Sequence, residues 1–168
     1  MFNKWETLSC TSKIVYLLSL CDKILPYLKE DANYKFVEEA MDRCWQWIIE
    51  KNIDADDLYF YLENLEDTGI LTLMQFTNDE RKLALWICTA NALLFTLYNA
   101  YKFQEEVYLP ETVEQLNERE MFNEFMDNFS KIYSEPDEME EILYRNLKDG
   151  KLNEMSRHKI SKLLNKLT

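Results

Sequence analysis

Few residues of this 168-residue chain could carry out acid–base or nucleophilic chemistry. Histidine, the commonest general base and metal ligand at neutral pH, occurs once, as His158, between the charged side chains Arg157 and Lys159. A Ser-His-Asp or Cys-His catalytic set would have to use this histidine, and no GxSxG motif accompanies it. The two glycines stand far apart, whereas a phosphate-binding loop needs several together. The sequence therefore predicts a surface histidine and a protein without catalytic residues.

One segment has the ligand spacing of a metal site. Asn52, Asp54, Asp56 and Glu63 fall at positions 1, 3, 5 and 12 of an EF-hand calcium loop. Asp57 stands at position 6, where such a loop needs glycine, and the residues after it have a helical pattern. We therefore interpret Asp54 as the N-cap of a helix whose first turn is acidic. With no ExxH motif and no close cysteine pair, we expect no metal and no other cofactor.

The composition predicts an all-α protein in one domain, residues 1–168. Apolar residues make up 47% of the chain, which is enough for a sizeable core despite 30% charged residues. Two glycines and three prolines are too few for the tight turns of an all-β fold. Helical periodicity therefore predicts a compact bundle of about seven helices around a buried central helix. The periodic segments are 12–29, 33–51, 54 to the turn at 67–69, 77–102, 110–133, 134–150 and 156–167, and a short apolar piece covers 70–76.

Start and stop signals predict where these helices end. Pro26 should end or kink the first helix, and Pro110 should occupy the first position of a later helix that either continues past Asn117 or breaks there. Thr77 and Glu80 form the pattern of a capping box at the start of the central helix. The remaining signals are Asn52 as a C-cap, Gly150 as a stop and Ser156 as an N-cap.

The stretch from Leu83 to Tyr101 carries no charge and is long enough to span a bilayer. Four polar residues interrupt it, and no second stretch of this kind occurs. We therefore interpret it as the buried central helix of the domain and predict no membrane partner. The interrupting residues are Thr89, Asn91, Thr96 and Asn99.

The cysteines predict a reducing compartment. Cys10, Cys21, Cys44 and Cys88 form no close pair, and the apolar neighbours of Cys10 and Cys21 suit buried free thiols on one helix face. The first residues show no charged segment followed by an apolar run and a cleavage site, so we expect no secretory signal. Both observations favour a cytoplasmic protein.

The formal net charge of −12 at pH 7 favours a basic partner, although acidity also serves solubility alone. We expect no nucleic acid partner, because phosphate contacts need Lys and Arg, and no anionic membrane. Residues 1–80 carry 16 acidic and 7 basic side chains, and residues 105–142 carry 13 acidic and 2 basic ones. Residues 143–168 carry 2 acidic and 7 basic side chains, so we expect this segment to pack against one of the two acidic blocks.

Aromatic residues near the middle of the chain suggest a binding surface. Trp45 and Trp47 lie about 200° apart on one helix, so one should face the core and the other a groove or second interface, unless the domain covers both. Tyr59 and Tyr61 have the same spacing and lie near several carboxylates, so one of them should likewise face the core and the other a surface, unless the domain covers both. An amphipathic ring at a surface is a typical anchor for a protein partner.

Several of these residues lie in segments that resemble the immunity protein 6 family. The segments are Cys44-Trp45-Gln46-Trp47, residues 51–59 (KNIDADDLY), residues 63–70 (ENLEDTGI), Ala100-Tyr101-Lys102 and Tyr108-Leu109-Pro110. The resemblance covers about the first two-thirds of the chain. It implies an all-α protein of a bacterial polymorphic toxin system, which stays in the producer's cytoplasm and neutralises the toxin domain of a cognate effector. It implies no catalytic residues.

We therefore predict an immunity protein that binds the C-terminal domain of a cognate toxin, which we expect to be basic, as a nuclease cleft is. The alternative is an acidic helical adaptor or regulatory protein with another basic partner, and a third candidate is a carboxylate metalloenzyme or calcium binder. The oligomeric state stays open. The predicted contact residues are Asp54, Asp56, Asp57, Glu63, Glu66 and Asp67, with Tyr59, Tyr61 and Trp47 as anchors and Glu138, Glu140 and Glu141 as the second choice.

Overall fold

The computed structural model describes residues 2–134, 136–148 and 157–164. Within these ranges the fold is all-α and has no strand, which confirms the predicted class. The prediction of about seven helices was too low, because α1, α5 and α7 have only four to six residues and show no periodic pattern. The helices are α1 (Phe2–Glu6), α2 (Cys10–Ile24), α3 (Tyr34–Glu50), α4 (Ala55–Leu62), α5 (Ile70–Gln75), α6 (Glu80–Phe103), α7 (Glu111–Glu114), α8 (Glu118–Ile132), α9 (Pro136–Lys148) and α10 (Arg157–Leu164), with a 3-10 helix over Leu25–Leu28.

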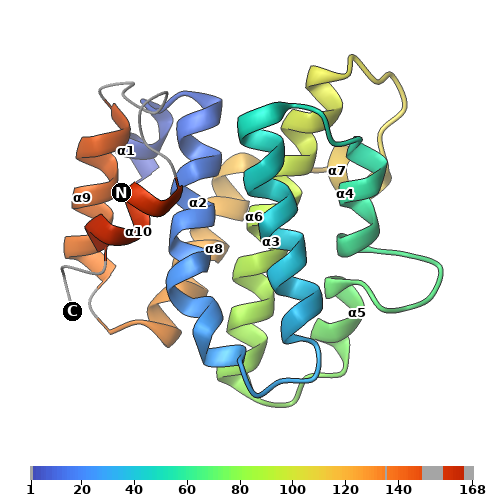
Figure 1. Cartoon of the computed structure of the whole chain (residues 1–168), viewed down its shortest axis with the longest axis horizontal. Helices are drawn as coiled ribbons and strands as arrows, with labels where there is room; N and C mark the ends of the chain where they lie inside the picture. The colour runs from blue at the N-terminus through green and yellow to red at the C-terminus, as the bar shows by residue number, and fades with distance from the viewer. Residues whose placement is uncertain (1, 135, 149–156, 165–168) are drawn as a thin grey trace.

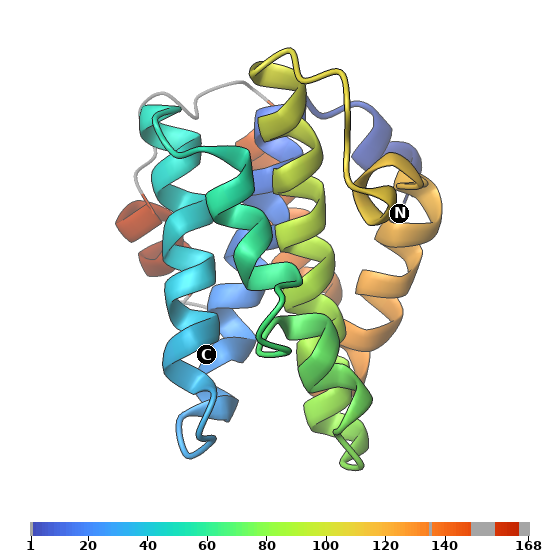
Figure 2. The same ribbon diagram turned by 90° about the vertical axis from the view of Figure 1, so that its right-hand side faces the viewer.

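The uncharged stretch forms α6, and α6 is the buried central helix that was predicted. It contacts α2, α3, α4, α5, α7 and α8 (Figure 2). By length and hydropathy α6 could cross a bilayer, but 72% of its most apolar window is buried inside the fold, as in the core helix of a bundle. Its buried hydroxyls are satisfied within the helix, since Thr89 and Thr96 donate to carbonyl groups one turn earlier.

The remaining helices occupy two ends of the molecule. At one end of the long axis, α9 and α10 pack on α2 (Figure 1). At the other end, α4 packs on α3 and α6, and α5 packs on α4 and α6. The fold therefore separates the predicted contact residues on α9 from the acidic start of α4.

Three local signals predicted helix ends correctly. Helix α2 ends at Ile24, where Pro26 turns the chain into the 3-10 helix. Asp54 caps α4, because its carboxylate accepts a 2.9 Å hydrogen bond from the backbone N–H of Asp56. The break near Asn117 is real, and the Asn117 side chain caps α8.

Three other signals were wrong by one or two residues. The C-cap of α3 is Lys51, at φ 54°, instead of Asn52. The N-cap of α6 is Asp79 instead of Thr77, and the Thr77 hydroxyl donates to a carbonyl group of α5. Pro110 stands at the N-cap of α7 instead of the first helical position. The signals at Gly150 and Ser156 lie outside the described residues.

The four cysteines are free thiols, and three of them are buried. The expectation of a buried Cys10 was wrong, because Cys10 is the first residue of α2 and lies at the exposed helix start. Cys21, Cys44 and Cys88 belong to the core. Burial raises the pKa of the Cys44 thiol to about 12, so it stays protonated at neutral pH.

Candidate partner-binding surface

The start of α4 is fixed against the end of α6. The Gln104 side chain accepts a 3.2 Å hydrogen bond from the Ala55 N–H and donates at 3.4 Å to the Asp54 carboxylate. The buried Tyr101 hydroxyl donates at 2.6 Å to Asp56. Burial and the neighbouring carboxylate raise the pKa of Tyr101, so the hydroxyl keeps its proton. Asp54 and Asp56 are exposed, but they also hold α4 in place.

A hollow of about 480 Å³ adjoins α4 on the side of α3. It brings together three of the predicted contact residues, Asp56, Asp57 and Tyr61. Carboxylates next to aromatic rings suit a cationic side chain, because the ring face and the carboxylate both attract positive charge. The sequence analysis missed the other lining residues, which are Arg43, Ile53 and Phe60.

The two predicted tyrosine anchors are half-buried within the protein. The Tyr59 hydroxyl donates at 2.6 Å to Glu63, and the Tyr61 ring packs 5.2 Å from Phe36. Burial raises the pKa of both hydroxyl groups. The ring that α4 exposes most fully is Phe60, which is 43% exposed. The sequence analysis could have identified Phe60 as a candidate anchor because it lies between Tyr59 and Tyr61 in the sequence.

The loop between α4 and α5 presents the predicted residues Glu66 and Asp67, both of them exposed. The Asn64 side chain braces this loop, because its oxygen accepts 3.1 Å hydrogen bonds from the backbone N–H groups of Glu66 and Thr68. Leu65 lies between these polar residues and is fully exposed. The loop therefore combines two carboxylates with an uncovered apolar side chain in a defined conformation.

Of the two options for the tryptophans of α3, a ring at a groove or second interface was wrong, and coverage of both rings by the domain is confirmed. Trp45 is 4% exposed and Trp47 is 2% exposed. The guanidinium of Arg157, from α10, lies 5.6 Å from the Trp45 ring. The ammonium of Lys51 lies 3.3 Å from the Trp47 ring centre, and the Phe103 ring packs against it edge-on. The domain covers both rings, so Trp47 is not exposed as an anchor.

The second predicted set lies on α9, at the opposite end of the molecule from α4 (Figure 1). Glu138 is exposed, whereas Glu140 is 7% exposed and lies in the core. Glu141 forms ion pairs with Lys4 and Arg145. The two predicted sets therefore do not form one surface, and much of the second set serves packing inside the protein.

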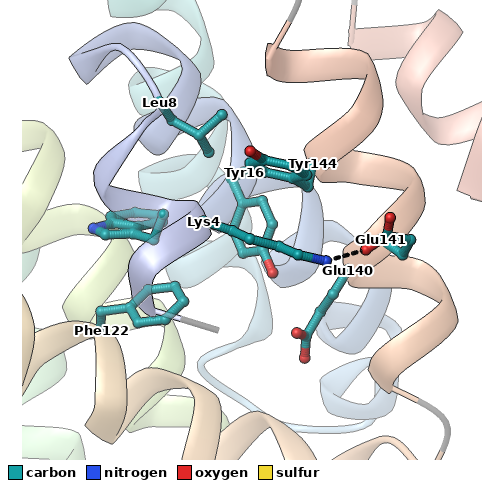
Figure 3. Close-up of a pocket in the computed structure, with 8 residues that line it drawn as sticks. Lys4, Leu8, Tyr16, Phe122, Glu140, Glu141 and Tyr144 are labelled. Atoms are coloured by element: carbon teal, nitrogen blue, oxygen red, sulfur yellow. Dashed lines mark hydrogen bonds and ion pairs between the residues drawn. The ribbon is translucent and has the colours of Figure 1, made fainter.

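The surroundings of Glu141 form a smaller hollow of about 240 Å³ (Figure 3). Lys4 of α1 crosses this hollow to reach Glu141 of α9. Behind it the Trp5 ring stacks on Phe122 at 4.5 Å, and the Trp5 indole N–H donates at 2.7 Å to Glu118. These contacts join α1 to α8 and α9. The residues that line the hollow therefore stabilise the packing of these three helices.

The described helix of the basic C-terminal segment, α10, packs on the first acidic block, which confirms one option of the sequence analysis for this part of the segment. Arg157 donates to both oxygens of Asp22, at 2.8 and 2.7 Å, and also forms an ion pair with Asp42. Ile160 of the same helix is buried. These contacts neutralise acidic residues of α2 and α3 but not those of α4. Among the described residues, no lysine or arginine lies within ion-pair distance of the carboxylates at 54–67.

These features define an acidic, all-α protein with a carboxylate surface at one end that forms no ion pair among the described residues. In the part of the chain that the structure describes, no three His, Cys, Asp or Glu side chains gather as a metal ion would require. The chain belongs to the Imm6 immunity protein family, whose model, described as immunity protein Imm6, matches residues 12–132. The family implies an immunity protein of a toxin system, a class that is generally non-enzymatic. Neither the curated proteins nor the solved structures gave a significant match.

The matched range covers most of α2 and continues to the end of α8. It therefore includes α4 and the loop that follows α6, and it excludes α9 and α10. The matched range thus includes the carboxylates at 54–67, which form no ion pair among the described residues.

Proposed function

We propose that this protein binds and neutralises the C-terminal domain of a cognate bacterial toxin in the cytoplasm of the producing cell. Membership of the Imm6 family supports the general role. The observation that carries the proposal further is the α4 surface, defined as Asp54, Asp56, Asp57, Glu63, Glu66 and Asp67 with the ring of Phe60. Its carboxylates form no ion pair with a lysine or arginine of the described residues. Tyr101 and Tyr59 donate hydrogen bonds to Asp56 and Glu63, and Arg43 lines the hollow beside α4. The exposed carboxylates of Asp57, Glu66 and Asp67 are therefore the ones most available to a basic protein.

Charge would act first on the rate of association. Complementary potentials raise association rates far above those of neutral surfaces, and the effect falls with salt. The hollow beside Asp57 would then receive a lysine or arginine side chain of the toxin, between the carboxylates and the Phe60 ring. The hydrogen bonds that Tyr101 donates to Asp56 and that Gln104 accepts from Ala55 hold α4 in place before binding, which lowers the entropy that binding costs.

The target that fits this surface best is a basic cleft, such as the substrate-binding cleft of a nuclease. A protein that occupies this cleft with carboxylates excludes the phosphate groups of the substrate from the same lysine and arginine side chains. Neutralisation would then follow from competition for the cleft and would need no catalytic group on the immunity protein.

Co-expression with the C-terminal domain encoded by the adjacent toxin gene tests the proposal. Cells that produce both proteins should grow, whereas cells that produce the toxin domain with an empty vector should die. The two proteins should also co-purify when the toxin domain carries an inactivating substitution. If the cells die equally with and without soluble immunity protein, the proposed function is wrong.

A further inference from the structure

The loop that joins α6 to α7 exposes apolar side chains that nothing in the described chain covers. Val107 is 82% exposed and Tyr108 is 89% exposed, and Phe103 at the end of α6 is 58% exposed. Contiguous exposed apolar residues are typical of protein-binding surfaces, and tyrosine is enriched among the residues that dominate binding energy. The sequence analysis assigned no binding role to this loop.

The same loop is acidic and lies next to the α4 surface. The loop, residues 104–110, includes two glutamates, Glu105 and Glu106, and no lysine or arginine. Gln104, the first residue after α6, bonds to both Ala55 and Asp54, so the loop starts at the first turn of α4. Figure 2 shows the loop at the same end of the bundle as the connection from α3 to α4. The loop therefore begins beside the first turn of α4 and runs from there to α7.

The loop has a defined conformation. Glu106 donates its N–H to the Tyr101 carbonyl at 3.1 Å and Glu105 donates to the Lys102 carbonyl at 3.2 Å, which is the pairing of a Schellman motif at the end of α6. In this motif Glu105 takes φ 58°, a position that normally holds glycine because other residues are strained there. Glu105 thus occupies a backbone conformation that glycine would adopt at a lower cost in free energy. Backbone strain of this kind is often found at functional positions.

The other strained positions of the described residues point to the same place. Besides Glu105, the non-glycine residues with positive φ are Lys51 and Asp67. Lys51 precedes α4 and Asp67 follows it. All three therefore adjoin the α4 surface, and no residue of α8, α9 or α10 shares this feature within the described ranges.

From these observations we infer that residues 103–108, the last residue of α6 and the first part of the α6–α7 loop, form a binding knob that inserts Val107 and Tyr108 into an apolar pocket within the basic cleft of the toxin domain. The inference rests on the proposed function and extends it, because it names a second contact element and the shape of its target. Glu105 and Glu106 flank the tip and would face lysine or arginine side chains at the rim of that pocket. The tip would supply affinity, and the carboxylates would supply orientation.

The test uses the full-length chain and the inactivated C-terminal domain encoded by the adjacent toxin gene. The double variant Val107→Ser, Tyr108→Ser should weaken binding about 30-fold or more, as loss of a central anchor does. Its unfolding midpoint should equal that of the wild type, because both side chains are exposed. Isothermal titration calorimetry and urea unfolding measure the two quantities.

Phe76→Ser is the matched control. Phe76 is 80% exposed, and it precedes α6 instead of following it, so it lies at the far end of the central helix. Its loss should change affinity less than about twofold. The inferred contact through residues 103–108 is contradicted if the double variant binds as tightly as the wild type, or if Phe76→Ser weakens binding equally. Either result leaves the proposed function in place. If the wild type itself does not bind, the proposed function is wrong and the knob with it.

A second variant separates binding from folding at the strained position. Glu105→Gly relieves the positive φ and should raise the unfolding midpoint, yet it should slow association with the toxin domain several-fold at low salt. An unchanged association rate would show that Glu105 does not contact the toxin domain.

Light scattering of the isolated wild type and double variant tests self-association. If the wild type is a dimer and the double variant a monomer, the exposed tip serves self-association, and the inference is overturned.

Discussion

The hydroxyl of Tyr101 donates a 2.6 Å hydrogen bond to the carboxylate of Asp56, which joins the central helix to the first turn of α4. Tyr101→Phe should lower the free energy of unfolding by about 1.5–3 kcal/mol, because hydrogen bonds to charged groups are worth about this much. Urea unfolding measures the loss. Repeating Tyr101→Phe in an Asp56→Ala background should give a much smaller loss, and an equal loss would mean that this hydrogen bond does not hold α4.

The two predicted carboxylate sets can be distinguished by a matched pair of substitutions. Asp57→Asn on α4 should slow association with the toxin domain several-fold at low salt, and the effect should shrink at high salt because the charges are screened. Glu138→Gln on α9 removes one charge from an exposed residue at the opposite end and should leave the rate nearly unchanged. Stopped-flow measurements at two salt concentrations decide the matter. A larger decrease in the association rate for Glu138→Gln than for Asp57→Asn would show that the toxin domain binds at α9 instead of α4.

The connection between α2 and α3 should give the protein a pH-dependent stability. Burial alone would raise the pKa of Asp31, but the hydrogen bonds from Lys82 and from the Asn33 backbone outweigh it and hold the pKa below its ordinary value of 3.8. Because the unfolded chain takes up this proton first as the pH falls, the contribution is present above about pH 4–5 and is lost as the pH falls through the folded-state pKa.

Asp31→Asn should therefore cost about 1 kcal/mol at pH 7 and much less near pH 3. Urea unfolding of both proteins across this range gives the difference directly, and other acidic groups cancel in the comparison. A difference that stays constant from pH 7 to pH 3 would show that the charge of Asp31 is not what stabilises the connection.

The turn before α5 requires glycine for reasons of space. A Cβ atom at Gly69 would lie 2.5 Å from the Leu62 carbonyl oxygen and 2.8 Å from the Glu63 Cα, and both are backbone atoms that cannot move aside cheaply. Gly69→Ala should lower the free energy of unfolding by about 1–3 kcal/mol. It should also weaken toxin binding, since it shifts the loop that carries Glu66 and Asp67. A variant as stable as the wild type in thermal unfolding would contradict the close approach.

The sequence predicted the fold class and the central helix because both depend on composition and apolar periodicity. The stretch from Leu83 to Tyr101 identifies a buried helix by itself. Helix ends were less predictable where two capping residues compete, as at Thr77 and Asp79, since only the path of the chain decides which side chain reaches the free N–H groups. Short helices such as α7 carry too few residues for any pattern.

The candidate surface was predicted in part for similar reasons. The acidic start of α4 is a local signal, so the sequence placed Asp54 and Asp57 correctly at the helix start, while their contact with a partner stays a prediction. The burial of Trp47 depends on Lys51 and on the Phe103 ring from another helix, and no spacing within α3 reveals such a contact. The role of Gln104 likewise depends on a contact between residues 49 positions apart.

Hydrogen–deuterium exchange of the protein, alone and in complex with the inactivated toxin domain, tests the central claim most directly. Amide exchange reports which backbone segments become protected, and it needs no substitution in either protein. We predict slower exchange in the complex over residues 54–67 and 103–108, with little change over 136–148. Protection confined to 136–148, with 54–67 and 103–108 unchanged, would contradict binding through the α4 surface.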